Sequence, residues 1–275
     1  MANISASDVK KLREMTGAGM MDCKKALAEA NGDFEKAAEI IRKKGIAVAS
    51  KRADREATEG VVLAKVTGDG TRGAIVVLNS ETDFVAKNEG FVALANSILD
   101  LALEKNPAGL EELKGLEMDG TSVSDVILQQ VGIIGEKIDI SYYEKLEASM
   151  VVPYIHPGNK LATLVGLNKK TGIQVGKDVA MQVAAMNPVS VDKDDIPQEV
   201  IDKEIEIGKE QARQEGKPEE LLERIAMGKL NKFYKESTLL NQDFTKDNKK
   251  TVNQYLQEFD KELTVTGFLR YGLGS

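Results

Sequence analysis

The chain has 275 residues, of which 42% are apolar, enough to bury the cores of two domains or of one domain with attachments. The 37 Lys and Arg residues against 44 Asp and Glu residues give a formal net charge of −7, which disfavours nucleic acid as the main ligand because a phosphate backbone is also negative. A single cysteine, Cys23, excludes an internal disulfide, and with a single histidine, His156, it argues against a transition-metal cluster.

Membrane and export segments are not expected in this chain. Met1–Leu12 lacks the apolar core of a signal peptide, and no run of residues is apolar over the length that spans a bilayer. We therefore expect a reduced, cytoplasmic protein. Paired nucleophiles and bases are scarce, so classical active-site chemistry is thinly supplied, and we expect no catalytic residue, no cofactor and no metal site in this chain.

Residues 1–45 predict a module of three helices. Ser5 is the expected N-cap of the first helix, which ends at Gly17. A second helix is expected over about Met20–Ala30. The third begins at Phe34, after an Asn-Gly-Asp turn, and is expected to end at Gly45.

Met20 and Met21 follow the glycine turn of this module and have two interpretations. If they are exposed, their flexible side chains suit an adaptable protein-binding surface. If they are buried, they fill the small core of the module. The residues alone favour neither interpretation.

Arg42–Arg55 is rich in basic residues and poor in apolar ones. We interpret residues 46–59 as a linker that is helical in part. A basic linker can contact RNA, but in a chain of net charge −7 a solvated connection is the better interpretation.

A hairpin is predicted from strands at Val61–Thr67 and Ala74–Leu78, joined by a Gly-x-Gly-x-x-Gly turn at Gly68–Gly73. A dinucleotide site needs a helix after these glycines, whereas a second strand follows here. A kinase glycine loop does lie in a hairpin, and Val85–Lys87 imitates the kinase strand lysine, but the His-Arg-Asp and Asp-Phe-Gly motifs are absent. We therefore expect no direct nucleotide binding.

The segment Thr82–Phe91 connects this hairpin to an amphipathic helix predicted at Phe91–Leu103. Phe84 stands beside the carboxylate of Asp83 in a connection that should lie at the surface. An exposed phenylalanine is costly unless another group covers it. Phe84 therefore either caps the core of this chain or contacts another protein.

Leu110–Gly132 predicts short helices, and Ile138, Ile140 and Tyr142 predict a strand by their alternation. An apolar turn at 133–135 lies between them. Gly135 there is the kind of residue that ends a helix.

From Val151 onward the chain repeats the order of hairpin, connection and helix. Strands are predicted at Val151–Ile155 and Leu161–Leu167 around a turn at 156–159, and a helix at Val179–Met186. This repetition predicts two related α/β subdomains. His156 lies at the tip of the second hairpin, where a histidine is usually solvated.

After a polar connector, Gln198–Gln214 and Glu219–Tyr234 predict an antiparallel pair of helices. A later helix is predicted at Asn248–Phe259 and a final strand at Leu263–Leu269. The apolar seam of the helical pair is expected to contain Val200, Ile201, Ile205, Ala212, Leu222, Ile225, Ala226 and Leu230.

Two long segments of the chain resemble signatures of the bacterial translation elongation factor Ts family. They are Leu12–Leu27, which reads LREMTGAGMMDCKKAL, and Thr82–Lys87, which reads TDFVAK. The resemblance covers nearly the whole chain, including the region around His156 and the ending Val265–Arg270.

The resemblance implies an α+β fold with a UBA-like N-terminal module of three helices, two related α/β core subdomains and an inserted antiparallel helical hairpin that forms a coiled coil. The expected boundaries are 1–45 for the helical module, 46–59 for the linker and 60–147 for the N-terminal core subdomain. The C-terminal core subdomain is expected at 148–197 and 235–275, with the coiled coil at 198–234.

The function implied by the resemblance is guanine nucleotide exchange on elongation factor Tu, in its GDP-bound and nucleotide-free forms. The alternatives are a protein-binding or RNA-binding module without exchange activity; a homodimer through the core or the coiled coil stays open. The contact that dislocates the partner's magnesium is implied at Thr82, Asp83, Phe84 and Val85. Other partner contacts are implied at Leu12, Arg13, Met20, Met21, Ile134, Gly135 and His156.

Overall fold

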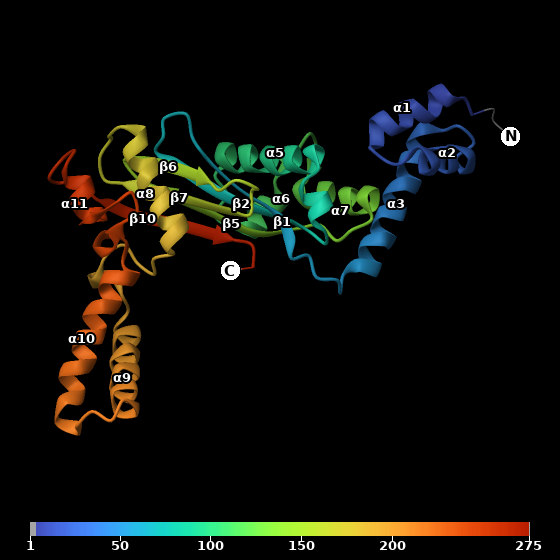
Figure 1. The fold of residues 1–275 in the computed structure, drawn as a ribbon. Helices are drawn as coiled ribbons and strands as arrows, with labels where there is room; N and C mark the ends of the chain where they lie inside the picture. Colours follow the sequence, from blue (N-terminus) through green and yellow to red (C-terminus); the bar gives the residue numbers. More distant parts are fainter. Residues whose placement is uncertain (1–3, 275) are drawn as a thin grey trace. The chain divides into compact units, whose positions relative to one another are not determined.

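The structure, a computed structural model, describes residues 4–274 (Figure 1). The chain divides into two compact units. Unit 1 comprises Met1–Leu63, Val76–Glu144 and Leu273–Ser275, and unit 2 comprises Ala64–Ile75 and Lys145–Gly272. Helices and strands occur in both, which confirms the α+β class. Among the described residues, no helix has the length and apolar character needed to cross a bilayer.

Unit 1 begins with α1 (Ala6–Thr16), α2 (Met20–Glu29) and α3 (Phe34–Arg52). The predicted cap is confirmed, because the amide of Asp8 donates to Ser5 Oγ at 3.1 Å and the amide of Ser5 donates to Asp8 Oδ2 at 3.0 Å. The core of this module is formed by Val9, Leu12, Ala18, Cys23, Ala26, Leu27, Ala30 and Ala37.

The third helix does not end at Gly45, so that prediction is wrong. Gly45 is buried inside α3, where this helix crosses α7 (Val123–Ile134). A Cβ atom at Gly132 would lie only 2.4 Å from the Gly45 Cα. The glycine therefore permits close helix packing here, and α3 runs on into the predicted linker as far as Arg52.

The first sheet has the strand order β1-β2-β5, from β1 (Glu59–Val66), β2 (Arg72–Ser80) and β5 (Asp139–Glu147). The predicted hairpin is confirmed, with strand ends shifted by one or two residues. After β2 come α4 (Asp83–Ala86), α5 (Glu89–Lys105) and α6 (Leu110–Gly115).

Two details between α6 and β5 differ from prediction. A small hairpin of β3 (Glu117–Met118) and β4 (Thr121–Ser122) separates α6 from α7, where only short helices were expected. In β5 the buried tyrosine is Tyr143, whereas Tyr142 is half-exposed. Strict alternation fails because Tyr143 turns inward and its hydroxyl donates to the carbonyl of Pro107 at 3.1 Å.

Unit 2 contains the second sheet, with the order β10-β7-β6. It is built from β6 (Met150–Ile155), β7 (Leu161–Leu167) and β10 (Val265–Gly272), all antiparallel, and α8 (Ile173–Met186) packs on β6 and β7. In both sheets the second hairpin strand is central and a later strand pairs with it. This common topology agrees with two related subdomains.

The inserted hairpin of α9 (Gln198–Gln214) and α10 (Glu219–Ser237) is confirmed (Figure 1). The helices approach closely at Gly208, where a Cβ atom would lie 3.1 Å from the Ala226 Cα. Val200 was expected in the seam but is exposed, because adjacent residues on a helix point about 100° apart and Ile201 takes the inward position. Short 3-10 turns, η1 (Lys193–Asp195) and η2 (Leu239–Asn241), flank the hairpin.

The helix predicted at Asn248–Phe259 begins only at Val252. Residues 247–251 instead form β9 (Asp247–Thr251), which pairs with β8 (Asp243–Phe244), and α11 (Val252–Gln257) follows. Thr251 is the N-cap of α11 in a capping box with Gln254, which fixes the start of the helix at this point.

Candidate functional site

The connection after β2 forms the single helical turn α4, and it displays Phe84. The ring of Phe84 is 83% exposed, while Ala86 of the same turn is buried. Phe84 therefore does not cap the core of this chain. The exposure excludes the first of the two interpretations open from the sequence, and a contact with another protein stays a prediction.

The start of α4 is held from a distant part of unit 1. The backbone amide of Thr82 donates to Glu136 Oε2 at 3.0 Å, and its hydroxyl donates to Glu136 Oε1 at 2.7 Å. The hydroxyl of Ser80 donates to the Thr82 carbonyl at 2.9 Å. Both ends of the Thr82 backbone unit are therefore engaged.

Glu81, immediately before Thr82, is held in the same way. It accepts from the amide of Lys137 at 2.6 Å and from the guanidinium of Arg52, at 2.8 Å to each carboxylate oxygen. The amide of Lys137 and then the charge of Arg52 lower the pKa of Glu81. Lys137 Nζ also donates to the carbonyls of Ala53 and Arg55, at 2.8 and 2.9 Å. The connection is thus tied to the end of α3.

Asp83 and Val85 complete this segment. Asp83 accepts a hydrogen bond from Lys87 Nζ at 2.6 Å, one helical turn later, and both side chains are accessible to solvent. Val85 is half-exposed beside Phe84. The segment 82–85 thus presents an aromatic ring, a carboxylate and an aliphatic side chain on one short turn.

Ile134 and Gly135 lie next to Glu136 and are therefore brought beside Thr82. Gly135 ends α7 in the left-handed region, at φ 79°, and its amide donates to the Val131 carbonyl at 2.9 Å. This is the helix-ending role expected for glycine. Ile134 is half-exposed in the last turn of α7.

The N-terminal module displays a separate set of side chains. Met20 and Met21 at the start of α2 are 59% and 64% exposed, so they do not fill the core. Arg13 on α1 is exposed as well. Leu12 is fully buried in the core of the module, so its side chain supports this surface without reaching it.

His156 belongs to unit 2, at the turn between β6 and β7. Its side chain is exposed, and its Nδ1 lies 2.9 Å from the hydroxyl of Tyr154. The two rings meet edge to face with centroids 6.0 Å apart. His156 and Tyr154 border a hollow of about 450 Å³ that also includes Met181 and Lys246.

The glycine turn at the tip of the first hairpin is organised around the carboxylate of Asp69. Asp69 accepts hydrogen bonds from the hydroxyl of Thr67 at 2.6 Å and from the amide and hydroxyl of Thr71 at 3.1 and 2.9 Å. These bonds lower the pKa of Asp69 to about 2, so it is ionised at neutral pH. A fixed negative charge in this position repels a phosphate group.

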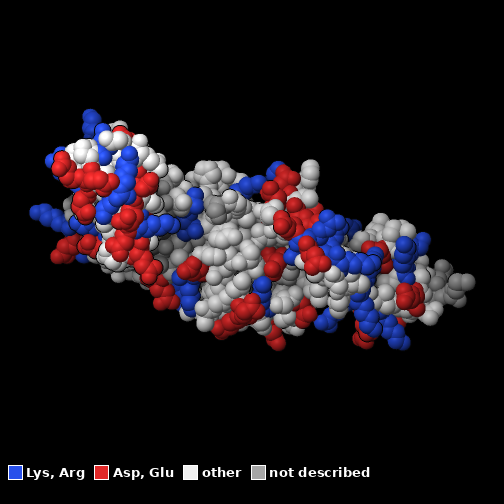
Figure 2. All heavy atoms as spheres, turned by 90° about the horizontal axis from the view of Figure 1, so that it is seen from below, with Lys and Arg blue, Asp and Glu red and all other residues white. Residues whose placement is uncertain are grey.

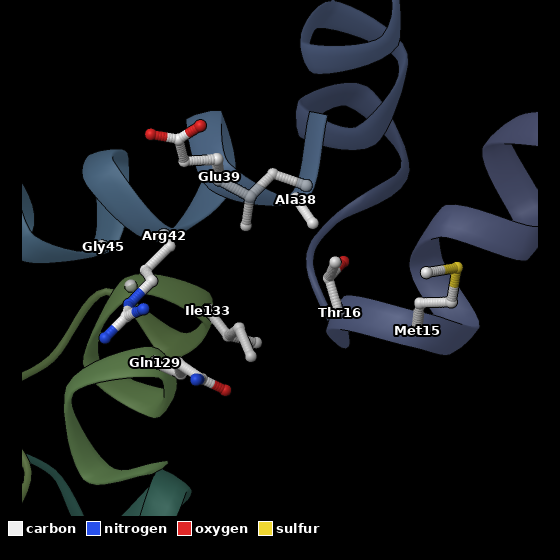
Figure 3. Close-up of a pocket in the computed structure, with 10 residues that line it drawn as sticks. Met15, Thr16, Ala38, Glu39, Arg42, Gly45, Gln129 and Ile133 are labelled. Carbon is white, nitrogen blue, oxygen red and sulfur yellow. The ribbon is translucent and has the colours of Figure 1, made fainter. Parts of the chain in front are cut away.

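A cavity of about 330 Å³ lies between α3, the end of α1 and α7 (Figure 3). Arg42 extends from α3 toward α7 in this view, and its guanidinium pairs with Asp125 at 3.3 Å. Glu39 pairs with Lys43 at 2.8 Å. Both charged lining residues are thus engaged, which is unfavourable for a charged ligand. Across residues 4–274, no three His, Cys, Asp or Glu side chains are placed to hold a metal ion.

The residues that fix the connection were missed by the sequence analysis. Glu81, Glu136, Lys137 and Arg52 are ordinary charged residues, and 54 positions separate Thr82 from Glu136. No short motif joins two such distant residues. Only the pairing of β5 with β2 places the end of α7 near the end of β2.

Comparisons with known proteins agree with the resemblance. A family model described as "Elongation factor TS" matches residues 81–275. A protein named "Elongation factor Ts" from Amoebophilus asiaticus is 54% identical over 275 residues, covering 99% of both chains. Proteins of the same name from Porphyromonas gingivalis and Chloroherpeton thalassium are 52% and 48% identical, with 99% or more of each chain covered. The chain therefore belongs to the elongation factor Ts family of translation elongation factors.

Proposed function

We propose that this chain is a guanine nucleotide exchange factor for elongation factor Tu and acts in the cytoplasm. It binds the GDP-bound partner, accelerates release of GDP and holds the nucleotide-free form. The observation that carries the proposal is Phe84, an aromatic ring 83% exposed on a turn whose base is fixed by four hydrogen bonds and an ion pair from Glu81, Thr82 and their partners. Family membership supports it independently.

Phe84 is the proposed wedge at the magnesium and phosphate site of the partner. Burying a phenylalanine ring stabilises a complex by about 1.5 to 3 kcal/mol. If the ring is buried chiefly when the partner is distorted, this free energy weakens nucleotide binding, and each 1.4 kcal/mol or so changes the rate about tenfold. By linkage, bound nucleotide weakens binding of the factor to the same extent. No covalent chemistry is required of this chain.

The other exposed residues are proposed to hold the partner while the wedge acts. Arg13, Met20 and Met21 would contact the nucleotide-binding domain, with Leu12 beneath them. Ile134 and Gly135 extend the surface around Thr82–Val85. His156, at the hairpin tip of unit 2, would contact a distant domain of the partner.

Release of labelled GDP from elongation factor Tu is the direct test. The parent chain should accelerate release in proportion to its concentration, and Phe84→Ala should lose at least about tenfold of this acceleration. The rival function is a binding module without exchange activity. A parent chain that binds elongation factor Tu yet leaves the rate of GDP release unchanged would support that rival and refute exchange.

The isolated chain is proposed to bind no nucleotide itself. Asp69 places a negative charge at the glycine turn, the only part of the sequence that imitates a phosphate loop. Calorimetric titration with GDP and magnesium should therefore show no specific heat. Binding that disappears on substituting Gly70 would contradict this expectation.

A further inference from the structure

Glu136 is half-exposed, and both oxygens of its carboxylate accept hydrogen bonds from the same residue, Thr82. Oε2 accepts from the Thr82 amide at 3.0 Å, and Oε1 accepts from the Thr82 hydroxyl at 2.7 Å. Hydrogen bonds to an ionised acceptor are stronger than those between neutral groups. Glu136 thus holds Thr82 through two hydrogen bonds. A rotation of the Thr82 backbone or side chain would break at least one of them.

Thr82 is the N-cap of α4, so the two hydrogen bonds to Glu136 hold the turn at its first residue. Its φ of −122° and ψ of 153° are extended, and its own side chain caps no amide of the turn because its hydroxyl is directed to Glu136. The amides of Ala86 and Lys87 close the turn by donating to the Thr82 and Asp83 carbonyls at 3.3 and 3.0 Å, and the Asn88 amide donates to the Val85 carbonyl at 3.0 Å. A single helical turn is unstable alone and depends on contacts of this kind.

The neighbouring residues form a reciprocal contact. The side chain of Glu136 holds the backbone and hydroxyl of Thr82, while the backbone amide of Lys137 holds the side chain of Glu81 at 2.6 Å. Two consecutive residues before Phe84 are thus bound to two consecutive residues after α7. Arg52 joins the same cluster from α3 through Glu81.

We infer that Glu136 is a positioning residue for nucleotide exchange, which holds the backbone of α4 through Thr82 so that Phe84 is presented from one fixed place on the chain. The inference rests on the proposed function of Phe84. A turn whose backbone is already ordered loses less conformational freedom when Phe84 enters the partner, so more of the binding free energy acts on the distorted partner.

Exchange assays on single variants give the first test. Glu136→Ala should slow stimulated GDP release by about tenfold, a loss within the range for hydrogen bonds to a charged group. Thr82→Val, which removes the hydroxyl but keeps the shape, should slow it by about fivefold, whereas Thr82→Ser restores the hydroxyl and should retain the parent rate. Glu104→Ala is the matched control, because it removes a glutamate of unit 1 that pairs with its neighbour Lys105.

A double-mutant comparison then separates positioning from any other role. In a Phe84→Ala background, Glu136→Ala should cause almost no further loss, because the side chain that it positions is gone. In the free chain, Glu136→Ala should speed hydrogen exchange at the Ala86 and Lys87 amides while leaving the melting temperature near that of Glu104→Ala.

Two results would overturn the inference. One is an unchanged exchange rate for Glu136→Ala. The other is an equal loss from Glu136→Ala with and without Phe84, since it would show that Glu136 acts independently of the ring. A parent chain that does not accelerate GDP release at all would instead overturn the proposed function itself, and the role of Glu136 in exchange with it.

Discussion

The connections that follow β2 and β7 occupy the same place in two sheets of the same topology, but their side chains make different contacts. After β2, Phe84 is left exposed on a braced turn. After β7, Asn168 and Lys169 turn back onto their own unit. Lys169 pairs with Asp260 at 3.1 Å and with Glu262 at 2.7 Å.

Asn168 completes the second connection with backbone contacts. Its side-chain Nδ2 donates to the Glu262 carbonyl at 2.8 Å, and its side-chain oxygen accepts from the Thr264 amide at 2.9 Å. This connection is thus bonded to residues 260–264, which lead into β10, and residues 168–172 include no apolar side chain. A repeated fold therefore does not repeat a function; the function depends on the particular residues placed at the connection.

The largest expected effect comes from removing the ring. Phe84→Ala should slow stimulated GDP release by tenfold or more, because about 1.5 to 3 kcal/mol of apolar contact is lost. The melting temperature should hardly change, since a ring that is 83% exposed contributes little to the core. Stopped-flow release of labelled GDP and thermal melting should be measured on the same preparation.

Lys169→Ala is the matched control in the second connection. It removes two surface ion pairs, and it should leave the exchange rate at the parent value. A comparable loss of exchange from Lys169→Ala would break the distinction between the connections. A Phe84→Ala variant that melts far below the parent but exchanges normally while folded would show that the ring serves the core.

Asp83→Ala should have a smaller effect, because it leaves the ring in place. Its pair with Lys87 spans one helical turn between accessible side chains, a contact worth about 0.3 to 0.5 kcal/mol, so a loss of about twofold is expected. Lys87→Ala is the matched variant. Equal losses would mean that the pair acts only by stiffening α4, whereas a much larger loss from Asp83→Ala would identify its carboxylate as a direct partner contact.

The sequence was most informative where local chemistry decides the structure. The Ser5 cap, the first hairpin and the limits of α9 all follow from residues close together in the chain. The end of α3 did not, because Gly45 serves a helix crossing with Gly132, and a glycine used for close packing looks the same in sequence as one that ends a helix.

Some residues of the candidate site could likewise be predicted from the sequence, and others could not. The strand-to-helix connection left two interpretations of Phe84; exposure in the folded chain removed the core cap, while the contact with another protein stays a proposal. Glu136 could not be found from the sequence, since its partner Thr82 lies 54 residues away and neither residue belongs to a shared spacing pattern. Leu12 lies within a recognised signature, yet its side chain is buried in the core of the helical module, and the signature itself does not separate core residues from exposed ones.

The two connections should also differ in how pH affects their contribution to folding. The pKa of Glu81 is lowered by the Lys137 amide and by Arg52, so its contribution is present above its ordinary value of 4.5 and is lost as pH falls through the folded pKa. The pKa of Lys169 is raised by Glu262 and then Asp260, so its contribution is present below 10.5 and is lost as pH rises through the folded pKa.

Denaturation of the parent, Glu81→Gln and Lys169→Met across pH tests these opposite signs. The difference in unfolding free energy between the parent and Glu81→Gln should disappear at acidic pH only. The corresponding difference for Lys169→Met should disappear at alkaline pH only. The difference for Lys169→Met should be the smaller one, because Lys169 and its partners are accessible to solvent and surface pairs contribute little, whereas the Glu81 side chain is only 15% exposed. If both differences disappear in the same pH range, the assigned pairings are contradicted.

The smallest effect is expected from the α9–α10 hairpin, which belongs to one of the two segments inserted before the last strand of each sheet. Before β5, the insertion ends in α7 and delivers Glu136 to Thr82. Before β10, it contains the α9–α10 hairpin, whose outer surface carries intermixed acidic and basic side chains, at the left of Figure 2. Several of these charges pair within the hairpin, as Lys209 does with Glu223 at 3.2 Å and Arg213 with Glu219 at 3.1 Å.

Replacing residues 198–234 by a short Gly/Ser linker should therefore change the exchange rate by less than about twofold, as for a surface change away from the contact. The base of the insertion is already closed, because the Val189 amide donates to the Ser237 carbonyl at 2.8 Å and the Leu239 amide donates to the Ser190 carbonyl at 3.0 Å. Circular dichroism must first show that the shortened chain is folded. Loss of nearly all exchange by such a folded variant would mean that the hairpin, and not only the Phe84 connection, acts on the partner.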